Sequence, residues 1–584
     1  MRILPLAILL TFAAFSLAQG DSSSVAEKST SGVQIDEIQF DIGDAFDDSK
    51  YHTKYDKWVY DILNILHIQT TESTVRKLLL FDPGDTVDSL KIIEAERFLR
   101  TQKYLSDASI TISNENGKNI AKVKTSDNWT LSPLVGLGHP GDEWTYGIGV
   151  QESNFLGLGH KLGFYYGHEE LRDMYQLEYG APHFLFRYNQ LDLLGSYNTD
   201  GYLISGVMNM PFLSRSKNQW AYTIAGLKSQ SFYHVYGSGD MPEGATPYPI
   251  TASSDSVRNL YLKSLPRYNG KKTVELMKVE DFRNDSLSFR LARSFGGVHR
   301  KLYLGATYDY KRSTAVDGKM FRYIFRDADQ TYALDSATAW NEWLPDVKDS
   351  RLGFYLMINN YRYEKIKNFH NVKWTEDIQK GYSLKFQLSK NYEQLAANNN
   401  DIRMDLWGDM YLGTGMHHLT LQSNARFYLD HGNQHDFYGK LNGEYIFHPT
   451  NALSTVLMGV VDFYENTPYG VQLSLGGADG FTGFPISYYT GQARVYGSLE
   501  QRWFPNFELA TFMPVFAAFA SVGETAWDFD DINRKDLIYV LGIGARFAQT
   551  KSISRLINRV DVSVPLNGAR KGDIHYSITT ALSL

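Results

Sequence analysis

The stretch LTLQSNARFYL, residues 419–429, points to the fold class because its side chains alternate in character along the chain. Odd positions, among them Leu419 and Phe427, are apolar or small, whereas even positions, among them Gln422 and Arg426, carry polar or charged groups. Successive side chains of a β-strand point to opposite faces. In an extended conformation, one face of this segment could meet lipid while the other faces water.

The same alternation returns elsewhere in residues 127–584, for example in YSLKFQLS (382–389) and KLYLGATYDY (301–310). A soluble sandwich also alternates, so no single strand settles the class. The repetition, with 14% aromatic residues and a mean hydropathy of only −0.33, favours a mainly β protein built as a transmembrane β-barrel. A closed barrel is the only sheet that satisfies every backbone group inside lipid, and each of its strands gives a weak signal.

Composition excludes several classes of function. The net charge is −7, and no run of Lys and Arg indicates a nucleic-acid partner. Cysteine is absent, and the 15 histidines lack the spacing of metal ligands, so no metal site is expected. Gly157-Leu158-Gly159 follows no βαβ unit and is interpreted as a tight turn rather than a phosphate-binding loop. We expect neither an enzyme nor a cofactor.

The N-terminus has the pattern of a cleaved export signal. Arg2 is followed by an apolar stretch over residues 3–17 and by the small residue Ala18. The alternative is a membrane anchor, but the stretch has roughly 15 residues where a spanning helix needs roughly 20. We expect a signal peptide over residues 1–18 and a disordered linker over residues 19–32.

Residues 33–126 are predicted to form a compact α+β module. The expected elements are a strand over 33–40, an amphipathic helix over 57–67, a helix containing Val75 and Leu78, a third helix capped by Asp88, and a hairpin that turns at Asn116-Gly117.

The barrel is expected over residues 127–584, with about 20 strands. Two long connections, at residues 235–280 and 313–349, and a Gly-rich one at residues 466–492 interrupt the alternation. The parity of the strands places all three connections at the end opposite the module. The closing strand alternates from Tyr576 to the final residue.

Three parts of the chain carry a resemblance to a known family. They are LLFDPGD (79–85) with EAERFLR (94–100) and KYLSDA (103–108), NFLGLG (154–159), and GGADGFTGFP (476–485). The first is similar to one POTRA domain, the second to an early hairpin turn, and the third to an inward-folded loop of the BamA/TamA/Sam superfamily of outer-membrane assembly and translocation barrels. The resemblance implies a bacterial outer-membrane barrel of about sixteen strands with a periplasmic POTRA-like domain.

In that family the loop tip carries an arginine that reaches acidic residues on the next two strands. The corresponding tip here comprises Gly480, Phe481, Thr482, Gly483 and Phe484. Thr482 stands at the arginine position, Glu500 matches one acid, and Ser521 stands where the other acid would be. Loss of both charged residues together makes physical sense, because either charge without its partner would be costly there. The alternative explanation is that the loop is a structural remnant whose sequence has drifted.

We therefore expect the loop to be held by packing of Phe484 and by ordinary hydrogen bonds to the wall near Glu500 and Ser521. Thr482→Arg together with Ser521→Asp should be tolerated, and Thr482→Arg alone should cost less than Ser521→Asp alone. Two further inward charges, Arg494 and Arg502, either belong to a solvated lumen or help to hold the loop.

The seam of the barrel is expected between the first and last strands. By resemblance the first strand runs from Trp129 to Gly138, in which Gly136 and Gly138 weaken the pairing. The last strand contributes Tyr576, Leu582 and Leu584.

The resemblance implies insertion, assembly or translocation of client proteins at the outer membrane. Unfolded outer-membrane or secreted clients would add a strand to the module and then reach the seam, and outer-membrane lipids would surround the barrel. The alternative is a passive pore or a surface-exposed structural barrel, which the missing loop arginine favours and the POTRA-like module disfavours.

Overall fold

A computed structural model describes residues 32–43, 67–139, 144–169, 172–213, 218–237, 274–315, 322–327, 330–335, 346–367, 375–429, 437–467, 471–477, 481–482, 484, 487–505, 507, 512–549, 557–568 and 570–581. The expected signal peptide, nearly all of the expected linker and the expected helix over 57–67, except His67, lie outside these residues.

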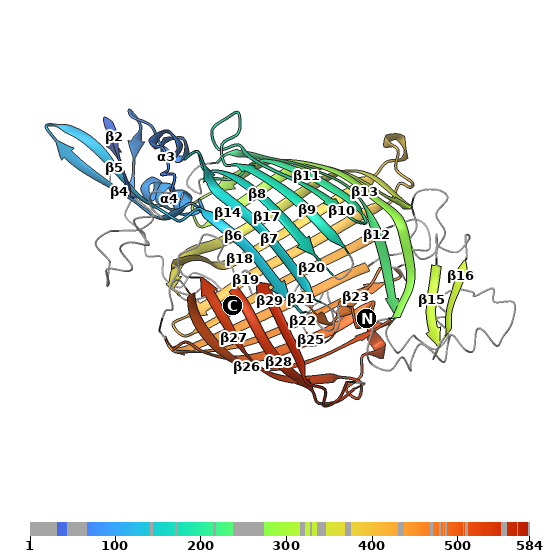
Figure 1. Ribbon diagram of the computed structural model, residues 1–584. Coiled ribbons are helices and arrows are strands. Elements are labelled where there is room, and N and C mark those ends of the chain that lie inside the picture. Colours follow the sequence, from blue (N-terminus) through green and yellow to red (C-terminus); the bar gives the residue numbers. More distant parts are fainter. Residues whose placement is uncertain are drawn as a thin grey trace.

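Twenty antiparallel strands form the wall of a closed transmembrane barrel (Figure 1). In chain order they are β6 (Leu131–Gly138), β7 (Thr145–Phe155), β8 (His160–His168), β9 (Asp173–Ala181), β10 (Gln190–Asn198), β11 (Gly201–Met210), β12 (Trp220–Gly237), β13 (Val274–Gly296), β14 (Arg300–Ala315), β17 (Val347–Lys367), β18 (Thr375–Asn391), β19 (Ile402–Thr414), β20 (His417–Leu429), β21 (Phe437–Thr450), β22 (Leu453–Glu465), β25 (Ala493–Trp503), β26 (Phe512–Ala526), β27 (Ile538–Gln549), β28 (Ile557–Pro565) and β29 (His575–Ala581).

The strand number agrees with the count from the sequence and exceeds the number that the family resemblance implied. The surplus lies in full wall strands, since β13 and β14 pair over fifteen residues and β19 and β20 over thirteen. The hairpin of β15 (Arg322–Asp327) and β16 (Gln330–Asp335) is not needed for closure, because β14 pairs directly with β17. In Figure 1 this hairpin lies at the end of the barrel opposite the module, and Arg322 of β15 pairs with Lys278 of β13.

Side chains alternate between the lumen and the outer face, as the segment in β20 predicted. Arg426 points inward and its Nε donates to Asp405 Oδ1 at 2.7 Å, whereas Leu429 is half exposed on the outer face. The outer face elsewhere carries exposed apolar side chains such as Ile148 and Leu177. Water would penalise this surface and lipid would not, which is the arrangement that a membrane barrel requires. No described helix is long and apolar enough to cross a membrane.

The N-terminal module lies at one end of the barrel (Figure 1). Its elements are β1 (Val33–Gln34), β2 (Glu37–Gly43), α3 (Glu72–Leu78), β3 (Thr86–Val87), α4 (Ser89–Arg100), β4 (Leu105–Glu115) and β5 (Lys118–Asp127). The sheet has the order β2-β5-β4, with β2 parallel to β5 and β4 antiparallel to it. Following the strands around the wall, the long connections after β12, β14 and β22 leave from the opposite end of the barrel, as predicted.

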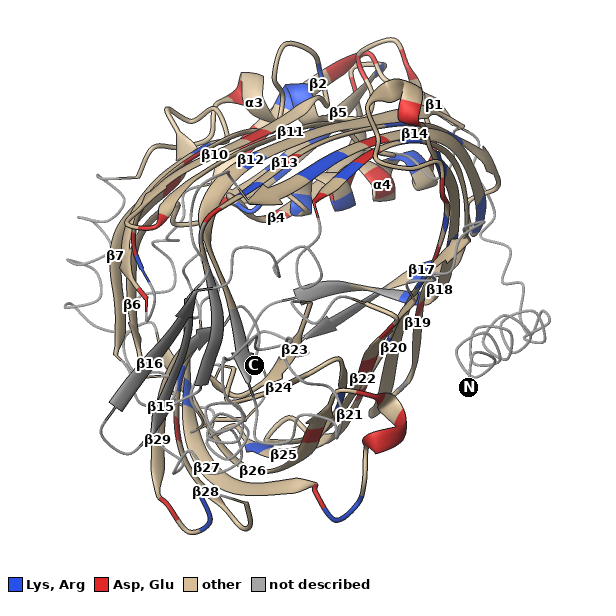
Figure 2. Cartoon of the chain, turned by 90° about the vertical axis from the view of Figure 1, so that its right-hand side faces the viewer, with Lys and Arg blue, Asp and Glu red and all other residues tan. Residues whose placement is uncertain are grey.

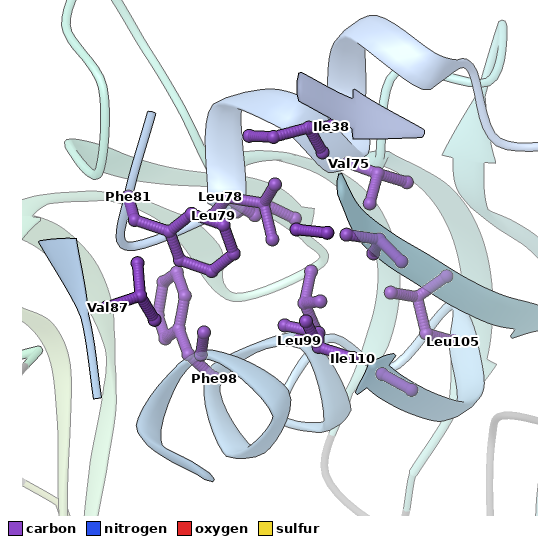
Figure 3. Packing of buried hydrophobic residues seen from close by; sticks show 14 of the residues in the cluster. Ile38, Val75, Leu78, Leu79, Phe81, Val87, Phe98, Leu99, Leu105 and Ile110 are labelled. Atoms are coloured by element: carbon purple, nitrogen blue, oxygen red, sulfur yellow. The ribbon is translucent and has the colours of Figure 1, made fainter. Parts of the chain in front are cut away.

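Local sequence explains most of the module. The Asp88 carboxylate accepts a hydrogen bond from Lys91 N at 2.8 Å and caps α4, as predicted. The turn at Asn116-Gly117 has φ of 53° and 81°, the left-handed conformation that such hairpins need. Apolar side chains of both helices meet the sheet in one core, and Figure 3 shows Leu78, Leu99 and Ile110 directed into it.

Two expectations for the module need correction. The predicted strand over 33–40 is divided, because Ile35 N donates to Asp85 O and Ile35 O accepts from Gly84 N, which ties β1 to β3 rather than to the main sheet. The boundary at residue 126 is also one residue early. Strand β5 ends at Asp127, whose carboxylate accepts hydrogen bonds from Thr70 N and Thr70 Oγ1 at 2.7 and 2.8 Å.

The turn between β7 and β8 docks against the module. Gly157 O accepts hydrogen bonds from Thr71 N and Thr74 Oγ1, both at 2.9 Å. Gly159 has a φ of 67°, and a Cβ there would stand 2.6 Å from the hydroxyl of Tyr104. The close packing of this turn on Tyr104 therefore requires glycine at position 159. Burial raises the pKa of the Tyr104 hydroxyl, with a smaller contribution from nearby Asp127, so the group stays protonated.

Arg187, in the connection between β9 and β10, makes the second attachment. Its guanidinium donates to the carbonyls of Arg76, Lys77 and Leu79 at 2.6–3.0 Å, and to the Asp82 carboxylate at 2.6 Å. The three carbonyls lie at the C-terminal end of α3, where the helix dipole favours a cation. One barrel side chain thus fixes the orientation of α3 on the rim.

We expect Arg187→Ala to loosen the module on the barrel, because four charge-assisted hydrogen bonds disappear, each of which contributes roughly 1.5–3 kcal/mol. Cysteines introduced for Lys118 and Met416 in this cysteine-free chain would carry spin labels, and the distance distribution between them should broaden. Arg172→Ala is the matched control, since Arg172 has a similarly exposed side chain and forms ion pairs with Glu169 and Asp200 of the barrel. An unchanged distribution in Arg187→Ala would show that this arginine does not orient the module.

Candidate functional site

The connection between β22 and β25 folds into the barrel. It contains β23 (Leu473–Leu475) and β24 (Tyr489–Gly491), which pair with each other, and Figure 2 shows both inside the ring of wall strands. Within this connection the structure describes Phe481, Thr482 and Phe484 of the expected tip; Gly480 and Gly483 lie outside the described residues.

Aromatic packing holds the tip. Phe481 and Phe484 are both fully buried, and their ring centroids are 5.6 Å apart. Phe481 meets the ring of Tyr496 on β25 at 5.8 Å, and Phe484 meets the ring of His575 on β29 at 6.0 Å. The tip therefore packs against both the wall that follows it in sequence and the last strand of the barrel.

A glycine in the wall makes room for this packing. A Cβ at Gly523 in β26 would stand 3.2 Å from the Phe481 ring and 2.8 Å from the backbone oxygen of Val495. Real Cβ atoms do not approach a backbone oxygen so closely, so a larger residue would force the strands or the loop to move.

Two wall side chains bind the backbone of the loop. Ser563 Oγ on β28 donates to Thr482 O at 2.8 Å. Arg494 on β25 donates through Nη1 to Ser474 O at 2.7 Å, while its Nε and Nη2 form a bidentate pair with Asp462 at 2.9 and 2.7 Å. Arg494 therefore contacts the loop at β23, some distance in sequence from the tip.

Glu500 is already occupied by arginines of its own wall. Its Oε1 accepts from Arg502 Nε at 2.6 Å, and its Oε2 accepts from Arg546 Nη2 at 3.0 Å and from Arg559 Nη2 at 3.3 Å. Arg546 also pairs with the buried carboxylate of Asp561. Three guanidinium groups and two carboxylates give this cluster one excess positive charge.

The structure thus brings some of the expected residues together and separates others. Arg502 pairs with Glu500, and no described contact joins Arg502 to the tip. Ser521 Oγ lies 3.4 Å from Tyr496 Oη, so the described hydrogen bond to the tip comes from Ser563 instead. The expectation for Thr482→Arg also changes, because the arginine would meet a carboxylate whose two oxygens already accept from three arginines.

Sequence reasoning missed Arg546, Arg559, Asp561, Ser563 and His575. All five sit at positions whose parity along β27, β28 and β29 points into the lumen. The alternation of side chains predicts that these residues face the lumen. Which residues they contact depends on the register between strands, which the sequence does not give. Among the described residues, no group of three or more histidine or acidic side chains could hold a metal ion.

The seam lies between β6 and β29, where the described overlap is offset. His139, which follows the last residue of β6, donates through its backbone N to Ile578 O in the middle of β29 at 3.0 Å. Gly136 and Gly138 pair with β7, and Tyr576 is exposed on the outer face. Trp129 precedes β6 and its ring lies 6.3 Å from that of His67, at the junction with the module. Leu582 and Leu584 lie outside the described residues.

No protein-family model matches the chain, and no curated protein matches it. Among solved structures, BamA from Haemophilus ducreyi lacking POTRA domains 1–3 is similar at 12% identity, with a TM-score of 0.38 over 94% of this chain and 85% of that one. CdiB from Escherichia coli is similar at 10% identity, with a TM-score of 0.42 over 98% and 97% of the two chains. CdiB from Acinetobacter baumannii is similar at 11% identity, with a TM-score of 0.41 over 98% and 96%. Scores this low add nothing to the barrel fold that the strand order itself establishes.

We expect Phe484→Ala to loosen the loop by roughly 3 kcal/mol, because it removes a fully buried aromatic ring. The measurement is the yield of a disulfide between cysteines replacing Thr482 and Ser563 in the membrane-inserted protein, which should fall sharply. Phe516→Ala is the matched control, since that ring is exposed on the outer face of β26. Equal yields in all three proteins would mean that Phe484 does not anchor the tip.

The excess positive charge of the Glu500 cluster leads to a prediction about substitutions at Thr482 and Ser521. Thr482→Arg alone should make the inward loop more susceptible to chymotrypsin than Ser521→Asp alone, because the cluster already carries excess positive charge. Combining the two substitutions should restore part of the resistance to chymotrypsin. The opposite order of the single variants would mean that Glu500 can exchange a wall arginine for one on the loop.

Proposed function

We propose that this chain is a bacterial outer-membrane barrel that assists the insertion, assembly or translocation of client proteins, with its POTRA-like module in the periplasm. The observation that carries the proposal is the inward loop, which links the lumen to the last two strands. Its tip accepts a hydrogen bond from Ser563 on β28 and packs on His575 of β29, beside the seam. This contact couples the loop to the strands that border the seam.

The module supports the same proposal. In the described sheet, β2 and β4 are the outer strands, and each has a neighbour on one side. Such an edge can accept an extended segment as an added strand, with main-chain hydrogen bonds supplying affinity. Gly157 and Arg187 hold this sheet on the rim, so a captured segment would be delivered to the same end of the barrel each time.

The strands next to the seam favour opening there. The contacts described across the seam are His139 N to Ile578 O at 3.0 Å and His139 Nδ1 to Tyr576 O at 3.3 Å, whereas β17 and β18 pair over seventeen residues. Separating β6 from β29 would break these contacts and leave the pairing of β6 with β7 and of β29 with β28 intact. A client strand could then pair with an exposed edge, and its own folding would supply the free energy without a cofactor.

A passive pore is the second candidate, and one observation favours it. The wall has twenty strands, and barrel diameter grows with strand number. A large steady conductance in planar bilayers would support this candidate, whereas a small and fluctuating conductance would support a barrel that the inward loop occupies.

A reversible lock on the seam tests the favoured proposal. Cysteines replacing His139 and Ile578 should form a disulfide between β6 and β29 under oxidising conditions. If clients use the seam, cells that carry the locked protein should show the same changes in their outer-membrane proteome as cells depleted of this protein. A reductant should then restore the normal proteome.

The matched control is a lock between two ordinary neighbours. Leu457 on β22 and Leu499 on β25 stand directly opposite each other, and a disulfide there should leave the proteome unchanged. A seam lock without effect, in cells where depletion does alter the proteome, would exclude the seam as the client route. An unaltered proteome after depletion itself would overturn the assembly role.

A further inference from the structure

A separate cavity of about 420 Å³ lies in the lumen at the end opposite the module. It is enclosed by the outer halves of β12, β13 and β14 on one side and of β20, β21 and β22 on the other, with the start of the inward loop at Thr467 and Val471. Its volume falls within the roughly 300–1,000 Å³ of small-ligand sites. The tip residues Phe481 and Phe484 are not among those that line it.

Aromatic side chains enter the cavity from both sides. Tyr438 and Tyr464 lie with their ring centroids 4.8 Å apart and their planes inclined by 32°. Tyr233 and Phe282, from the other side, form a second pair at 5.0 Å. Tyrosine combines an apolar ring face with a hydroxyl, which suits a ligand that has both C–H surface and hydroxyl groups.

The charged residues that line the cavity are Lys311 and Arg426, and none of its described lining residues is acidic. Arg426 is held by its Nε on Asp405 Oδ1, and the other oxygen of this buried carboxylate accepts from Arg403 Nε at 2.8 Å. These hydrogen bonds fix the orientation of the Arg426 guanidinium at one edge of the cavity. Lys311 is exposed to the lumen and stands opposite Asp349 on β17, whose Oδ1 accepts hydrogen bonds from Arg351 Nη2 at 3.1 Å and Asn391 Nδ2 at 2.9 Å.

The walls of the cavity argue against a peptide ligand. Lys311 and Ser313 lie on β14 between β13 and β17, and Arg426 and Tyr438 lie on strands that are likewise paired on both sides. No strand edge is free here to pair with an extended backbone. What the cavity offers instead is ring faces, two cations, and the polar pair of Ser313 Oγ and Asn284 Oδ1 at 2.6 Å.

We propose that this cavity binds a sugar ring that carries a phosphate or carboxylate group. The ring stacks its C–H face on Tyr438 and Tyr464, and the anion lies against Lys311 and Arg426. Arginine and lysine are the side chains that recognise such anions. Asn284 and Ser313 are placed to exchange hydrogen bonds with ring hydroxyls. This activity goes beyond the proposed handling of clients and does not involve the seam.

The anionic sugar has two potential sources, the lipopolysaccharide of the surrounding membrane and a soluble sugar phosphate. Binding to the whole purified protein in detergent would be measured by saturation-transfer NMR and calorimetry with glucose 1-phosphate and with deacylated, phosphorylated lipopolysaccharide core. Tighter binding of the core identifies the membrane as the source, and binding of glucose 1-phosphate alone identifies a soluble sugar.

Single substitutions separate the two parts of the site. Lys311→Gln leaves a polar side chain that is one atom shorter and removes its charge, and should weaken binding of glucose 1-phosphate about tenfold while leaving the weak binding of glucose unchanged. Tyr464→Leu should weaken the binding of both sugars. Lys385→Gln is the matched control, because Lys385 is an inward lysine that lies over Trp407, outside the cavity. Heat-modifiable migration on gels would confirm that each variant is folded.

Three results would overturn the proposal. Inorganic phosphate binding as tightly as glucose 1-phosphate would reveal an anion site without sugar recognition. An acidic peptide that displaces the sugar phosphate and binds more tightly would assign the cavity to protein clients. Equal binding by the wild-type protein and the Lys311→Gln and Tyr464→Leu variants would place the ligand elsewhere.

Discussion

Inside a bilayer each backbone N–H and C=O that lacks a partner costs several kcal/mol, because lipid offers no hydrogen bonds. Every wall strand of this protein therefore needs a neighbour on both sides, and the sheet has to close on itself. The long central strands meet this requirement with ladders of up to seventeen paired residues. The junction of β6 and β29 meets it with short strands and an offset contact at His139 and Ile578. The inward loop contacts the last strands beside this junction.

A second constraint comes from the charges in the lumen. Arg546 is fully buried, and its guanidinium is shared between Glu500 and Asp561, while Arg494 is shared between Asp462 and a loop carbonyl. Burying an ion is expensive unless a partner of opposite charge and further hydrogen bonds accompany it. Local pairing of this kind explains how a threonine can stand at the loop tip. Glu500, the acid that the resemblance matched to a loop arginine, accepts from three arginines of the wall.

The sequence was sufficient for features that depend on near neighbours. The alternation of side chains predicted β20 and the barrel. Asp88 predicted the start of α4, and Asn116-Gly117 predicted a hairpin. It was insufficient where distant segments meet. Arg546 and Arg559 reach Glu500 across 46 and 59 residues, a proximity that depends on three strand registers. The division of residues 33–40 into two strands likewise depends on Asp85, which binds Ile35 from a distant turn.

At the junction that closes the barrel, His139 contacts Ile578 and also the carbonyl of Tyr576, which lies 437 positions further along the chain. The entropy cost of closing a loop rises with its length, and contacts between distant segments slow folding. Closure of this junction carries the largest loop-closure cost in the wall, and until it occurs both β6 and β29 present open edges. Open edges are templates for aggregation. An unclosed copy of this barrel would therefore be prone to pair edge to edge with other open strands.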